Sequence, residues 1–600
     1  MNGRRFRDES RVMKRWGSRL ELLVRQYHIA GLGRSMKTCP TRRLWAWWVA
    51  FPTPPCALRG MHQEADVGGW LLYSKHYRSI GISIKSPLIP FPSVLPSGVP
   101  LMLLIIILRS STTRPRIFAR SWYKALPKRA MSSSAHFDAA IIGSGQGGTP
   151  LASAFANAGK KVALIERAHI GGCCINEGCT PTKTMVASGR VAYLARRAAD
   201  YGVNTGAQLA VDMTKVRQRK RDIVESFRGG SERRVKEAGI DLIMGDARFT
   251  DSRSIAIAAA EGENKDITAD IIVINTGARP AKPKLEGLES VDPARVLDST
   301  SIQELDVVPE HLILLGGGYI ALEFGQLFRR LGAKVSVVQR SRQLLPREDA
   351  DIAASMKEIL EQDGIQIFLQ SEAQSISSFP ENLLLKIKGS DGKSQTLSGS
   401  HLLVAIGRTP NTDTLDLSKA DIEINKAGYI PVNDHLQTSV PHIYALGDVK
   451  GGAAFTHVSY DDFRILQSHI LATNTATKKS LADRIANYVV YTDPQLGHVG
   501  LHEYEARRLS DRKIQVAKMP MSYVARALET DESRGMMKAV VDAEDKNILG
   551  FTCLGLEGGE IMAVVQTAML GNLTYESLRD AVFAHPSLAE SLNNLWGFLE

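Results

Sequence analysis

Two cysteines near residue 175 have the residue type and spacing of a redox pair. Cys174 and Cys179 are separated by four residues within the segment GGCCINEGCTPTK, a wider spacing than a thioredoxin-like CxxC. Pro181 suits the first turn of a helix, and the dipole of that helix would lower the pKa of Cys179 and favour its thiolate. Zinc would need two more ligands nearby, and the sequence offers none, so we predict no metal site. A structural cystine is the alternative.

A histidine close to the C-terminus could move the proton that thiol–disulfide exchange requires. His585 stands in FAHPSLAE and is followed by Glu590 in the same segment. Imidazole titrates near neutral pH, and a carboxylate on its other nitrogen would fix the tautomer. A lone histidine before proline is more often a turn residue, so this assignment depends on the other motifs in the chain.

The cysteines follow a complete dinucleotide-binding pattern. The run 137–142 (FDAAII) is typical of a buried strand, and a glycine turn, a helical stretch and a second strand ending in Glu166 come after it. Gly143 permits the tight turn, Gly145 lets the backbone approach a pyrophosphate, and Gly148 allows close helix–strand packing. Glu166 is placed to accept hydrogen bonds from ribose hydroxyls. The bare glycine motif is weak, but this full context predicts a dinucleotide site.

The same unit recurs about 170 residues later. The strand-like run HLILL precedes Gly316 and Gly318, and a helical stretch and the strand KVSVV follow. This second strand ends near Arg340 and Arg342 instead of an acid. An acid would favour the 2′-hydroxyl of NAD, whereas arginine accommodates a 2′-phosphate, so we expect NADPH, with NADH left open. The alternative is that both are solvated loop arginines.

The net charge of +11 reflects the N-terminus more than the body of the chain. Basic residues are concentrated in residues 1–130, and the mildly acidic remainder gives no reason to expect nucleic-acid binding. The apolar run 99–108 is too short to span a bilayer. Three interpretations compete for residues 1–130: a removable targeting segment that starts near Met102, non-native sequence upstream of a true start at Met131, or a membrane or nucleic-acid anchor. We expect a cytoplasmic or mitochondrial-matrix protein, because the cysteine usage suggests a reducing compartment.

Together these motifs closely resemble the class I pyridine nucleotide–disulfide oxidoreductases, which include glutathione reductase, dihydrolipoyl dehydrogenase and mercuric reductase. The resemblance covers about residues 136 to 600. Four further segments match the family's crossover out of the FAD domain, its return, the second FAD fingerprint and the start of the interface domain. They are INTGARP (274–280), GRTPN (407–411), the stretch from Thr438 to Asp448, and VYTDP (490–494).

The resemblance implies roles for the central residues. Cys174 is similar to the interchange thiol that faces substrate, and Cys179 to the thiol that contacts flavin. Lys183 and Glu323 resemble the family's ion pair beside flavin N5, and Tyr319 the aromatic gate over the nicotinamide pocket of glutathione reductase. The same comparison implies further cofactor-binding residues for FAD and NADP. They are Thr276, Gly277, Gly407 and Asp448, the last binding the ribityl chain.

The base and its orienter in this family resemble His585 and Glu590. The family's histidine comes from the neighbouring subunit, so the resemblance implies a homodimer. The expected fold class is α/β, with two Rossmann-like three-layer dinucleotide-binding domains and a C-terminal α+β dimerisation domain. The expected domains are an N-terminal extension (1–130), an FAD-binding domain (131–280 and 411–483), an NAD(P)H-binding domain (281–410) and an interface domain (484–600).

The expected function is therefore an FAD-dependent oxidoreductase that passes electrons from NAD(P)H through flavin to the cysteine pair and on to a small-molecule acceptor. A disulfide, a metal ion and a quinone are the candidate acceptors. The tail ends in NNLWGFLE without the vicinal cysteines of mercuric reductase, and it resembles a bacterial branch that defends against reactive chlorine and reduces metal ions. Cys173, where the family usually has threonine, is either a packing substitution or a further thiol for metal or oxidant handling. Dihydrolipoyl dehydrogenase activity, mercuric reductase activity and an anchoring subunit with little catalysis are the alternatives.

Overall fold

The structure is a computed structural model that describes residues 134–600, apart from 207–208 and 473–477. Contacts divide the chain into units 1–120 and 121–600, and every described residue belongs to the second unit. The three interpretations of residues 1–130 therefore lie outside the described residues. Within the described part, no helix is long and apolar enough to cross a membrane.

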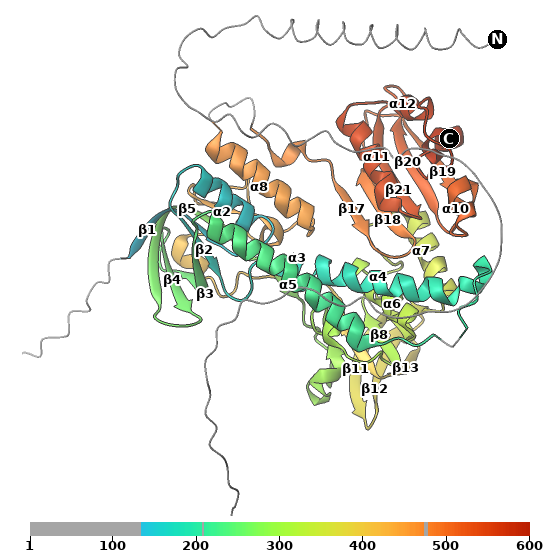
Figure 1. Ribbon diagram of the computed structural model, residues 1–600, viewed down its shortest axis with the longest axis horizontal. Helices are drawn as coiled ribbons and strands as arrows, with labels where there is room; N and C mark the ends of the chain where they lie inside the picture. Colours follow the sequence, from blue (N-terminus) through green and yellow to red (C-terminus); the bar gives the residue numbers. More distant parts are fainter. Residues whose placement is uncertain (1–133, 207–208, 473–477) are drawn as a thin grey trace, which may run out of the picture. The chain divides into compact units, whose positions relative to one another are not determined.

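The first sheet carries the first glycine turn (Figure 1). Its central strand β1 (Ala135–Ile142) pairs in parallel with β2 (Val162–Glu166) and β5 (Lys265–Ile274). The remaining strands of the sheet are β3 (Asp241–Phe249), β4 (Ser254–Ala259) and β16 (Ile443–Ala445). Helix α2 (Gly148–Asn157) connects β1 to β2 and packs beside α8 (Thr456–Leu471). Because helices cover the parallel strands, the end of β1 is a continuous buried apolar run.

Two helices after β2 carry the cysteine segment, and a third packs beside them. The short α3 (Gly172–Asn176) leads into α4 (Cys179–Arg196), and α5 (Met213–Glu237) returns beside it. Helix α4 also packs against α6 (Tyr319–Leu331), the helix after the second glycine turn. The redox segment therefore lies between the two dinucleotide-binding units.

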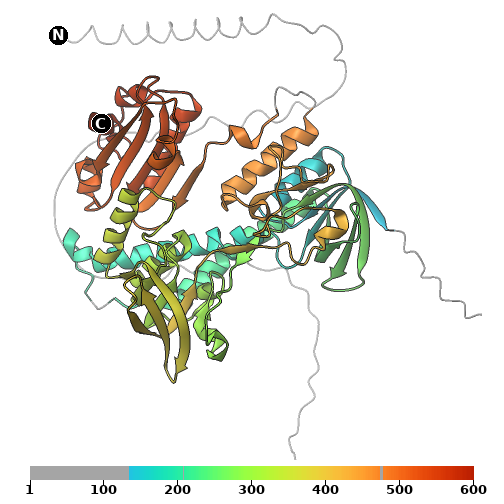
Figure 2. The same ribbon diagram turned by 180° about the vertical axis from the view of Figure 1, so that it is seen from behind.

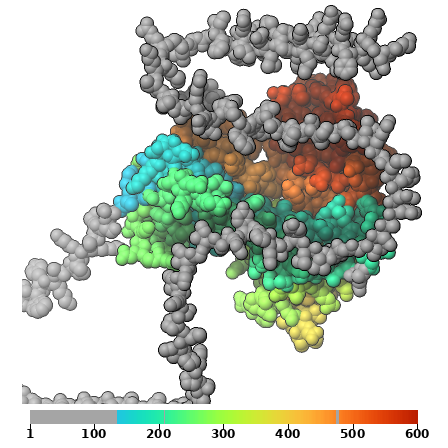
Figure 3. Space-filling view, in the orientation of Figure 1, coloured from blue at the N-terminus to red at the C-terminus, as the bar shows by residue number. Residues whose placement is uncertain are grey.

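The second sheet is built from parallel pairs around the second glycine turn. Its strand order is β10 (Gln366–Phe368), β9 (Lys334–Val338), β8 (His311–Leu315), β14 (His401–Val404) and β7 (Val296–Leu297). Helix α7 (Ala350–Gln362) lies between β9 and β10 in the chain. An antiparallel sheet of β11 (Ser371–Phe379), β12 (Asn382–Gly389) and β13 (Ser394–Gly399) packs beside it, and its hairpin projects in the space-filling view of Figure 3.

The chain enters and leaves this second unit through two adjacent strands. Strand β6 (Ala278–Pro280) pairs antiparallel with β15 (Arg408–Pro410). These are the segments that the sequence comparison matched to the family's crossover and return. Their pairing explains how residues 278 and 410 come to the same place beside the first sheet.

The C-terminal part is an antiparallel sheet covered by helices, seen from both sides in Figures 1 and 2. The strand order is β17 (Asn487–Val490), β18 (Gln495–Gly500), β21 (Ile548–Gly555), β20 (Met536–Asp542) and β19 (Ile514–Pro520). Its helices are α9 (Glu503–Ala506), α10 (Ala525–Glu529), α11 (Gly558–Leu570), α12 (Tyr575–Arg579) and α13 (Ser591–Asn594). The expected α/β class, with two dinucleotide-binding units and a C-terminal α+β part, is confirmed.

Candidate functional site

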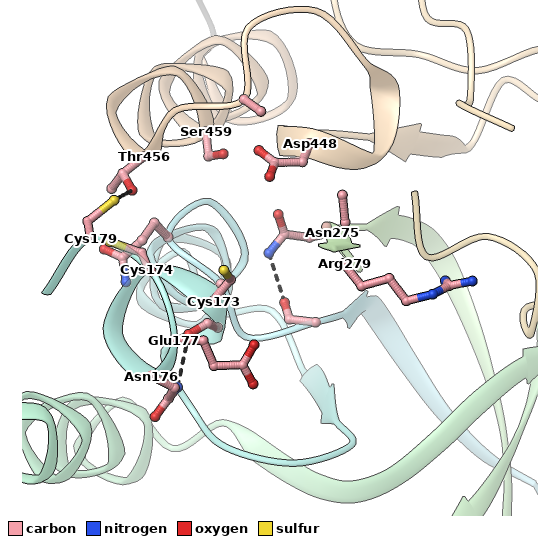
Figure 4. Close-up of a pocket in the computed structure, with 18 of the residues that line it drawn as sticks. Cys173, Cys174, Asn176, Glu177, Cys179, Asn275, Arg279, Asp448, Thr456 and Ser459 are labelled. Carbon is pink, nitrogen blue, oxygen red and sulfur yellow. Dashed lines mark hydrogen bonds between the residues drawn. The ribbon is translucent and has the colours of Figure 1, made fainter. Parts of the chain in front are cut away.

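A cavity of about 870 Å³ opens at the carboxyl ends of β1, β2 and β5. This is the edge at which open α/β sheets bind ligands. The expected site residues that line it come from the two dinucleotide-binding units, and Figure 4 labels Cys174, Cys179 and Asp448 among them. They are Gly143, Gly145, Glu166, Cys174, Cys179, Lys183, Thr276, Gly277, Tyr319, Glu323 and Asp448. The structure therefore brings eleven of the expected site residues around one space.

The first glycine turn leaves no room for side chains at two positions. Gly143 has φ +104°, and a Cβ there would lie 2.3 Å from the carbonyl oxygen of Asn275. A Cβ on Gly148 would lie 2.2 Å from the carbonyl oxygen of Gly143. Both positions thus require glycine, the first for conformation and the second for close helix–strand approach.

Glu166 has a further role that the sequence did not indicate. Its carboxylate accepts hydrogen bonds from the backbone N–H and the hydroxyl of Ser144, at 3.1 and 2.6 Å, and from the N–H of Ala168 at 2.9 Å. These bonds tie the end of β2 to the glycine turn. The carboxylate also lines the cavity, where it retains acceptor capacity for a hydroxyl group.

The second glycine turn has open space in front of it. Gly316 has φ +117° and approaches the backbone of Ala405, whereas a Cβ on Gly318 would meet no atom within 4 Å. Arg340 and Arg342 lie exposed after β9, and neither forms an ion pair with a described residue. These four residues and Gly148 and Gly407 do not line the large cavity.

The two cysteines of the redox segment are unlike in their protonation. The sulfur of Cys179, the first residue of α4, lies 3.3 Å from the hydroxyl oxygen of Thr456. A hydrogen bond from Cys174 lowers the pKa of Cys179 to about 6, with help from Thr456 and the nearby Lys183 ammonium. The same bond raises the pKa of Cys174, and burial raises it further. Cys179 is thus the thiolate of the pair, and side-chain hydrogen bonding is the main cause of its low pKa.

Lys183 and Glu323 form a close ion pair at the wall of the cavity. The ammonium donates to the carboxylate at 2.6 Å, and the other carboxylate oxygen accepts from the backbone N–H of Tyr491 at 2.8 Å. Lys183 is four residues after Cys179 on α4, so both side chains lie on the same face of the helix. The Glu323 side chain is only 3% exposed. The pair joins the redox helix to α6 and to the start of the C-terminal part.

Arg408 and Thr456 are cavity residues whose roles the sequence reasoning missed. Arg408 donates to the Cys173 sulfur at 3.5 Å and to the carbonyl of Ala278, and its Nε is buried without an acceptor among the described residues. Asp448 lies 3.9 Å away, and burial raises the pKa of its carboxyl. Arg408 stands inside the GRTPN motif, and that motif was a signal available in the sequence.

The side chain of Cys173 points in a different direction from those of Cys174 and Cys179. Figure 4 shows its sulfur on the side nearer Asn275, away from Thr456. Burial raises the pKa of the Cys173 thiol, while the Arg408 guanidinium opposes that rise. The thiol therefore faces the dinucleotide end of the cavity.

His585 and Glu590 contact each other but not the cavity. The imidazole Nδ1 lies 2.9 and 3.0 Å from the two carboxylate oxygens, in the segment between α12 and α13. This contact fixes the tautomer and leaves Nε2 for another partner. The His585 side chain is 68% exposed. One chain alone does not bring the histidine to its own cysteines.

The cavity suits a flavin dinucleotide. Its volume is that of a large-ligand pocket, glycines form the wall at the carboxyl end of β1, and α2 presents free N–H groups there. The buried Nε of Arg408 and the buried carboxyl of Asp448 are polar groups that a polar ligand would satisfy.

Comparison with known proteins identifies the class. The family described as pyridine nucleotide-disulphide oxidoreductase matches residues 137–467, and the dimerisation domain of the same family matches residues 486–595. The chain belongs to this family. It is an NAD(P)H-dependent flavoprotein disulfide oxidoreductase that uses flavin and a pyridine nucleotide. Its dimerisation domain supports a homodimer.

Individual relatives span nearly the same part of the chain. The probable pyridine nucleotide-disulfide oxidoreductase RclA of Escherichia coli is 36% identical over 468 residues, covering 77% of this chain and 99% of the relative. Mercuric reductase of Staphylococcus aureus is 34% identical over 76% of this chain and 81% of its own length. Dihydrolipoyl dehydrogenase of Bacillus subtilis is 32% identical over 76% and 96%.

A solved structure resembles the fold directly. It is described as the Cu(II) complex of the HOCl-induced flavoprotein disulfide reductase RclA from Escherichia coli. It superposes with a TM-score of 0.69 at 35% identity, and covers 77% of this chain and 99% of the other. The predicted family and type of reaction are therefore confirmed.

Proposed function

We propose that this chain is an NADPH-dependent reductase in which electrons reach Cys174 and Cys179 by way of FAD and then pass to a metal ion. The observation that carries the proposal is the opposite pKa shift of the two thiols at the wall of one cavity. As a disulfide the pair accepts two electrons, and as a thiolate beside a protonated thiol it can donate them again.

FAD and NADP are assigned to the two glycine turns. When bound, the flavin would supply two-electron chemistry between a nicotinamide and a thiol pair. The residues proposed for FAD are Gly143, Gly145, Gly148, Glu166, Thr276, Gly277 and Asp448. Those proposed for NADP are Gly316, Gly318, Tyr319, Arg340, Arg342 and Gly407. The exposed guanidinium groups of Arg340 and Arg342 support the choice of NADP, because they could contact a 2′-phosphate.

The proposed domains follow the sheets. The FAD-binding domain comprises residues 131–280 and 411–483, a division supported by the pairing of β5 with β16. The NAD(P)H-binding domain comprises residues 281–410, and the interface domain residues 484–600. In the proposed homodimer, His585 of the partner subunit faces the Cys174 thiol.

Each site residue then has its own role in the proposed electron transfer. Two electrons and one proton, the equivalent of a hydride from NADPH, reduce the Cys174–Cys179 disulfide to a thiol at Cys174 and a thiolate at Cys179. Thr456 and Lys183 hold the negative charge on Cys179, while Cys174 keeps its proton until His585 of the partner subunit accepts it. Two Cu(II) ions each accept one electron from the pair and become Cu(I), which re-forms the disulfide and releases the single proton of Cys174 to His585 of the partner subunit. Glu323 holds Lys183 beside the thiolate.

Copper(II) is the proposed acceptor because a relative of similar fold has been solved as a Cu(II) complex. Cys174 and Cys179 supply two sulfur atoms at the wall of the cavity, and thiolates are strong ligands for copper(I). Disulfides and quinones are the other acceptors that this thiol pair could reduce.

The test uses the purified full-length chain with its flavin. NADPH added without oxygen should produce the long-wavelength absorbance of a thiolate in contact with flavin, and copper(II) should then restore the oxidised spectrum. Glutathione disulfide, lipoamide, mercury(II) and a quinone are compared in the same assay. Absence of the long-wavelength band would refute the electron path, whereas a band that only a disulfide discharges would refute the metal acceptor alone.

A further inference from the structure

Two buried side chains, Glu348 and His502, meet the half-buried Tyr488 at the edge of the cavity. Glu348 lies between β9 and α7, Tyr488 is on β17, and His502 precedes α9. The Tyr488 hydroxyl donates to Oε1 of Glu348, and Nε2 of His502 lies 3.2 Å from the phenol oxygen. The cluster thus joins the second sheet's unit to the C-terminal part.

The hydrogen bonds of this cluster leave two buried atoms without a partner. The phenol has a single proton, which it gives to Glu348, so Nε2 of His502 must carry a proton and donate to the phenol oxygen. Nδ1 of His502 and Oε2 of Glu348 then face each other at 3.9 Å. Both atoms are buried, and neither has a hydrogen-bond partner among the described residues. Such orphaned groups are costly unless a proton or ligand occupies the gap.

The surrounding charges determine where a proton would reside. Burial raises the pKa of Glu348 to about 7; the hydrogen bond from Tyr488 opposes this rise, while the neighbouring carboxylate of Asp349 adds to it. Burial lowers the pKa of His502; the Lys538 ammonium adds to this, while Asp349 and Glu505 oppose it. The remaining titratable groups facing the cluster are His498, whose pKa burial lowers to about 3, and the Tyr504 phenol. The proton therefore belongs on Glu348 below neutral pH.

A metal ion is the other candidate occupant, since a nitrogen of His498 brings the set to three ligand atoms within 4.8 Å. The geometry disfavours it. The His498 ring stacks on that of His502, with centroids 3.9 Å apart and planes 12° apart, so their in-plane lone pairs cannot converge on one ion. Both His498 nitrogens also have partners already, the hydroxyl of Thr552 and the carbonyl of Gly500.

The cluster is connected to the cavity through stacked rings. The Tyr488 ring stacks on Phe455 with centroids 5.5 Å apart and planes 7° apart, and Phe455 lies 5.5 Å from the ring of Tyr319. All three rings line the cavity. The position of the Tyr488 hydroxyl is thus coupled to the wall on which the nicotinamide gate rests.

We propose that Glu348 is a positioning residue that acts through Tyr488, and that a proton held between Glu348 and His502 keeps the nucleotide wall of the cavity in place. The inference rests on the proposed function in one respect, the role of Tyr319 as the nicotinamide gate. Loss of the proton puts a charge on the buried, unpaired Oε2 of Glu348 beside Asp349. In this proposal the repulsion outweighs the hydrogen bond from Tyr488, so the carboxylate turns away and Tyr488 loses its anchor. Binding of NAD(P)H then weakens as the pH rises through neutrality.

The first test compares the KM for NADPH of the full-length holoenzyme from about pH 5 to about pH 9, where one linked proton changes KM by at most tenfold per pH unit. In the wild type KM rises above neutral pH. Glu348→Gln keeps a neutral, isosteric side chain, so its KM stays at the low-pH value. Tyr488→Phe keeps the ring and removes the hydroxyl, so it also loses the pH dependence. The matched control Glu361→Gln, at an exposed carboxylate on α7, keeps the wild-type slope. Titration of the nucleotide itself cancels between variants.

The second test does not depend on activity. The infrared band of a buried carboxylic acid should titrate near neutral pH in the wild type and be absent from Glu348→Gln. A wild-type KM slope retained in both Glu348→Gln and Tyr488→Phe would overturn the coupling, even if the band titrates as expected. No titrating band, or stoichiometric zinc or copper that is lost in Glu348→Gln, would overturn the proton site. Neither infrared outcome depends on the electron acceptor, so a failure here is distinct from a failure of the proposed function.

Discussion

The Thr456 hydroxyl lies 3.3 Å from the Cys179 sulfur, although the two residues are 277 positions apart in the chain. Thr456 is the first residue of α8 and Cys179 the first residue of α4, so the contact joins two helix starts at the cavity. Together with the hydrogen bond from Cys174, the threonine lowers the pKa of Cys179. The charge of the Cys179 sulfur thus depends on residues outside its own helix.

Thr456→Val should therefore weaken the thiolate. A hydrogen bond to a charged group contributes about 1.5–3 kcal/mol, so its loss should raise the pKa of Cys179 by at least about one unit. The thiolate forms as pH rises through the pKa, which is about 6 in the wild type. The midpoint of the long-wavelength absorbance against pH measures the shift. Thr456→Ser, which keeps the hydroxyl, should retain the wild-type midpoint; an equal shift in both variants would contradict the hydrogen-bond explanation.

Two substitutions should separate the two roles of Cys174, its hydrogen bond to Cys179 and its part in the redox reaction. Cys174→Ser keeps a hydroxyl that can donate to Cys179, so the thiolate band should persist or strengthen while turnover with any acceptor is lost. Cys174→Ala removes the strongest cause of the low pKa, and the band's midpoint should move to higher pH. Anaerobic spectra at several pH values measure both. If Cys179→Ser instead preserved the band, the assignment of the two thiols would be reversed.

The sequence predicted the local pattern of the fold well, because glycine turns and buried strands are encoded within short segments. The predicted strands VALIE, HLILL and KVSVV coincide with β2, β8 and β9. The low pKa of Cys179 was predicted, but its main causes were not. The sequence offered the helix dipole, whereas in the structure the hydrogen bonds from Cys174 and Thr456 lower the pKa, and no local pattern connects Thr456 to Cys179.

Contacts between residues far apart in the chain explain the other features that the sequence did not predict. The predicted ribose acceptor Glu166 also holds Ser144, and Arg408 contacts Cys173 across 235 positions of the chain. The Glu348 cluster combines three segments, none of which carries a recognisable motif. The position of His585 and Glu590 relative to the cysteine pair does not follow from a single chain, because neither residue lines the cavity. Their role and the nucleotide preference remain predictions.

The Lys183–Glu323 pair should contribute to stability as well as to chemistry. Lys183→Met leaves the nearly buried carboxylate of Glu323 without its cation, and breaking such a pair costs about 3 kcal/mol. The double variant Lys183→Met with Glu323→Leu removes both charges and should recover part of that loss. Denaturant unfolding of the holoenzyme measures it. Lys215→Met, at an exposed lysine on α5, is the control and should change stability by less than about 1 kcal/mol. Equal losses at both lysines would contradict the argument.

Arg340 should set the nucleotide preference. Arg340→Glu places a carboxylate where the 2′-phosphate is expected, so KM for NADPH should rise about 10- to 100-fold while KM for NADH falls or stays constant. Arg342→Glu should have a smaller effect in the same direction. Steady-state kinetics with both nucleotides measure the ratio. Arg347→Glu is the charge-matched control, since Arg347 is also exposed in the loop after β9. An equal effect at Arg347 would point to general electrostatics instead of a specific contact.

His585 should act in the oxidative half of the cycle and on the partner's cysteines. His585→Ala should slow turnover with copper(II) by about 10²- to 10⁴-fold, while reduction by NADPH alone is unaffected. Glu590→Gln should have a smaller effect, because it only loosens the tautomer fixed by the contact at 2.9 Å. Cys174→Ser and His585→Ala homodimers are each inactive, but a heterodimer of the two holds one site with an intact cysteine pair and an intact histidine. Unfolding and refolding the mixture should restore activity, up to a quarter of the wild-type value if chains pair at random. If the mixture stays inactive although exchange of subunits is demonstrated, the histidine acts within its own chain or not at all.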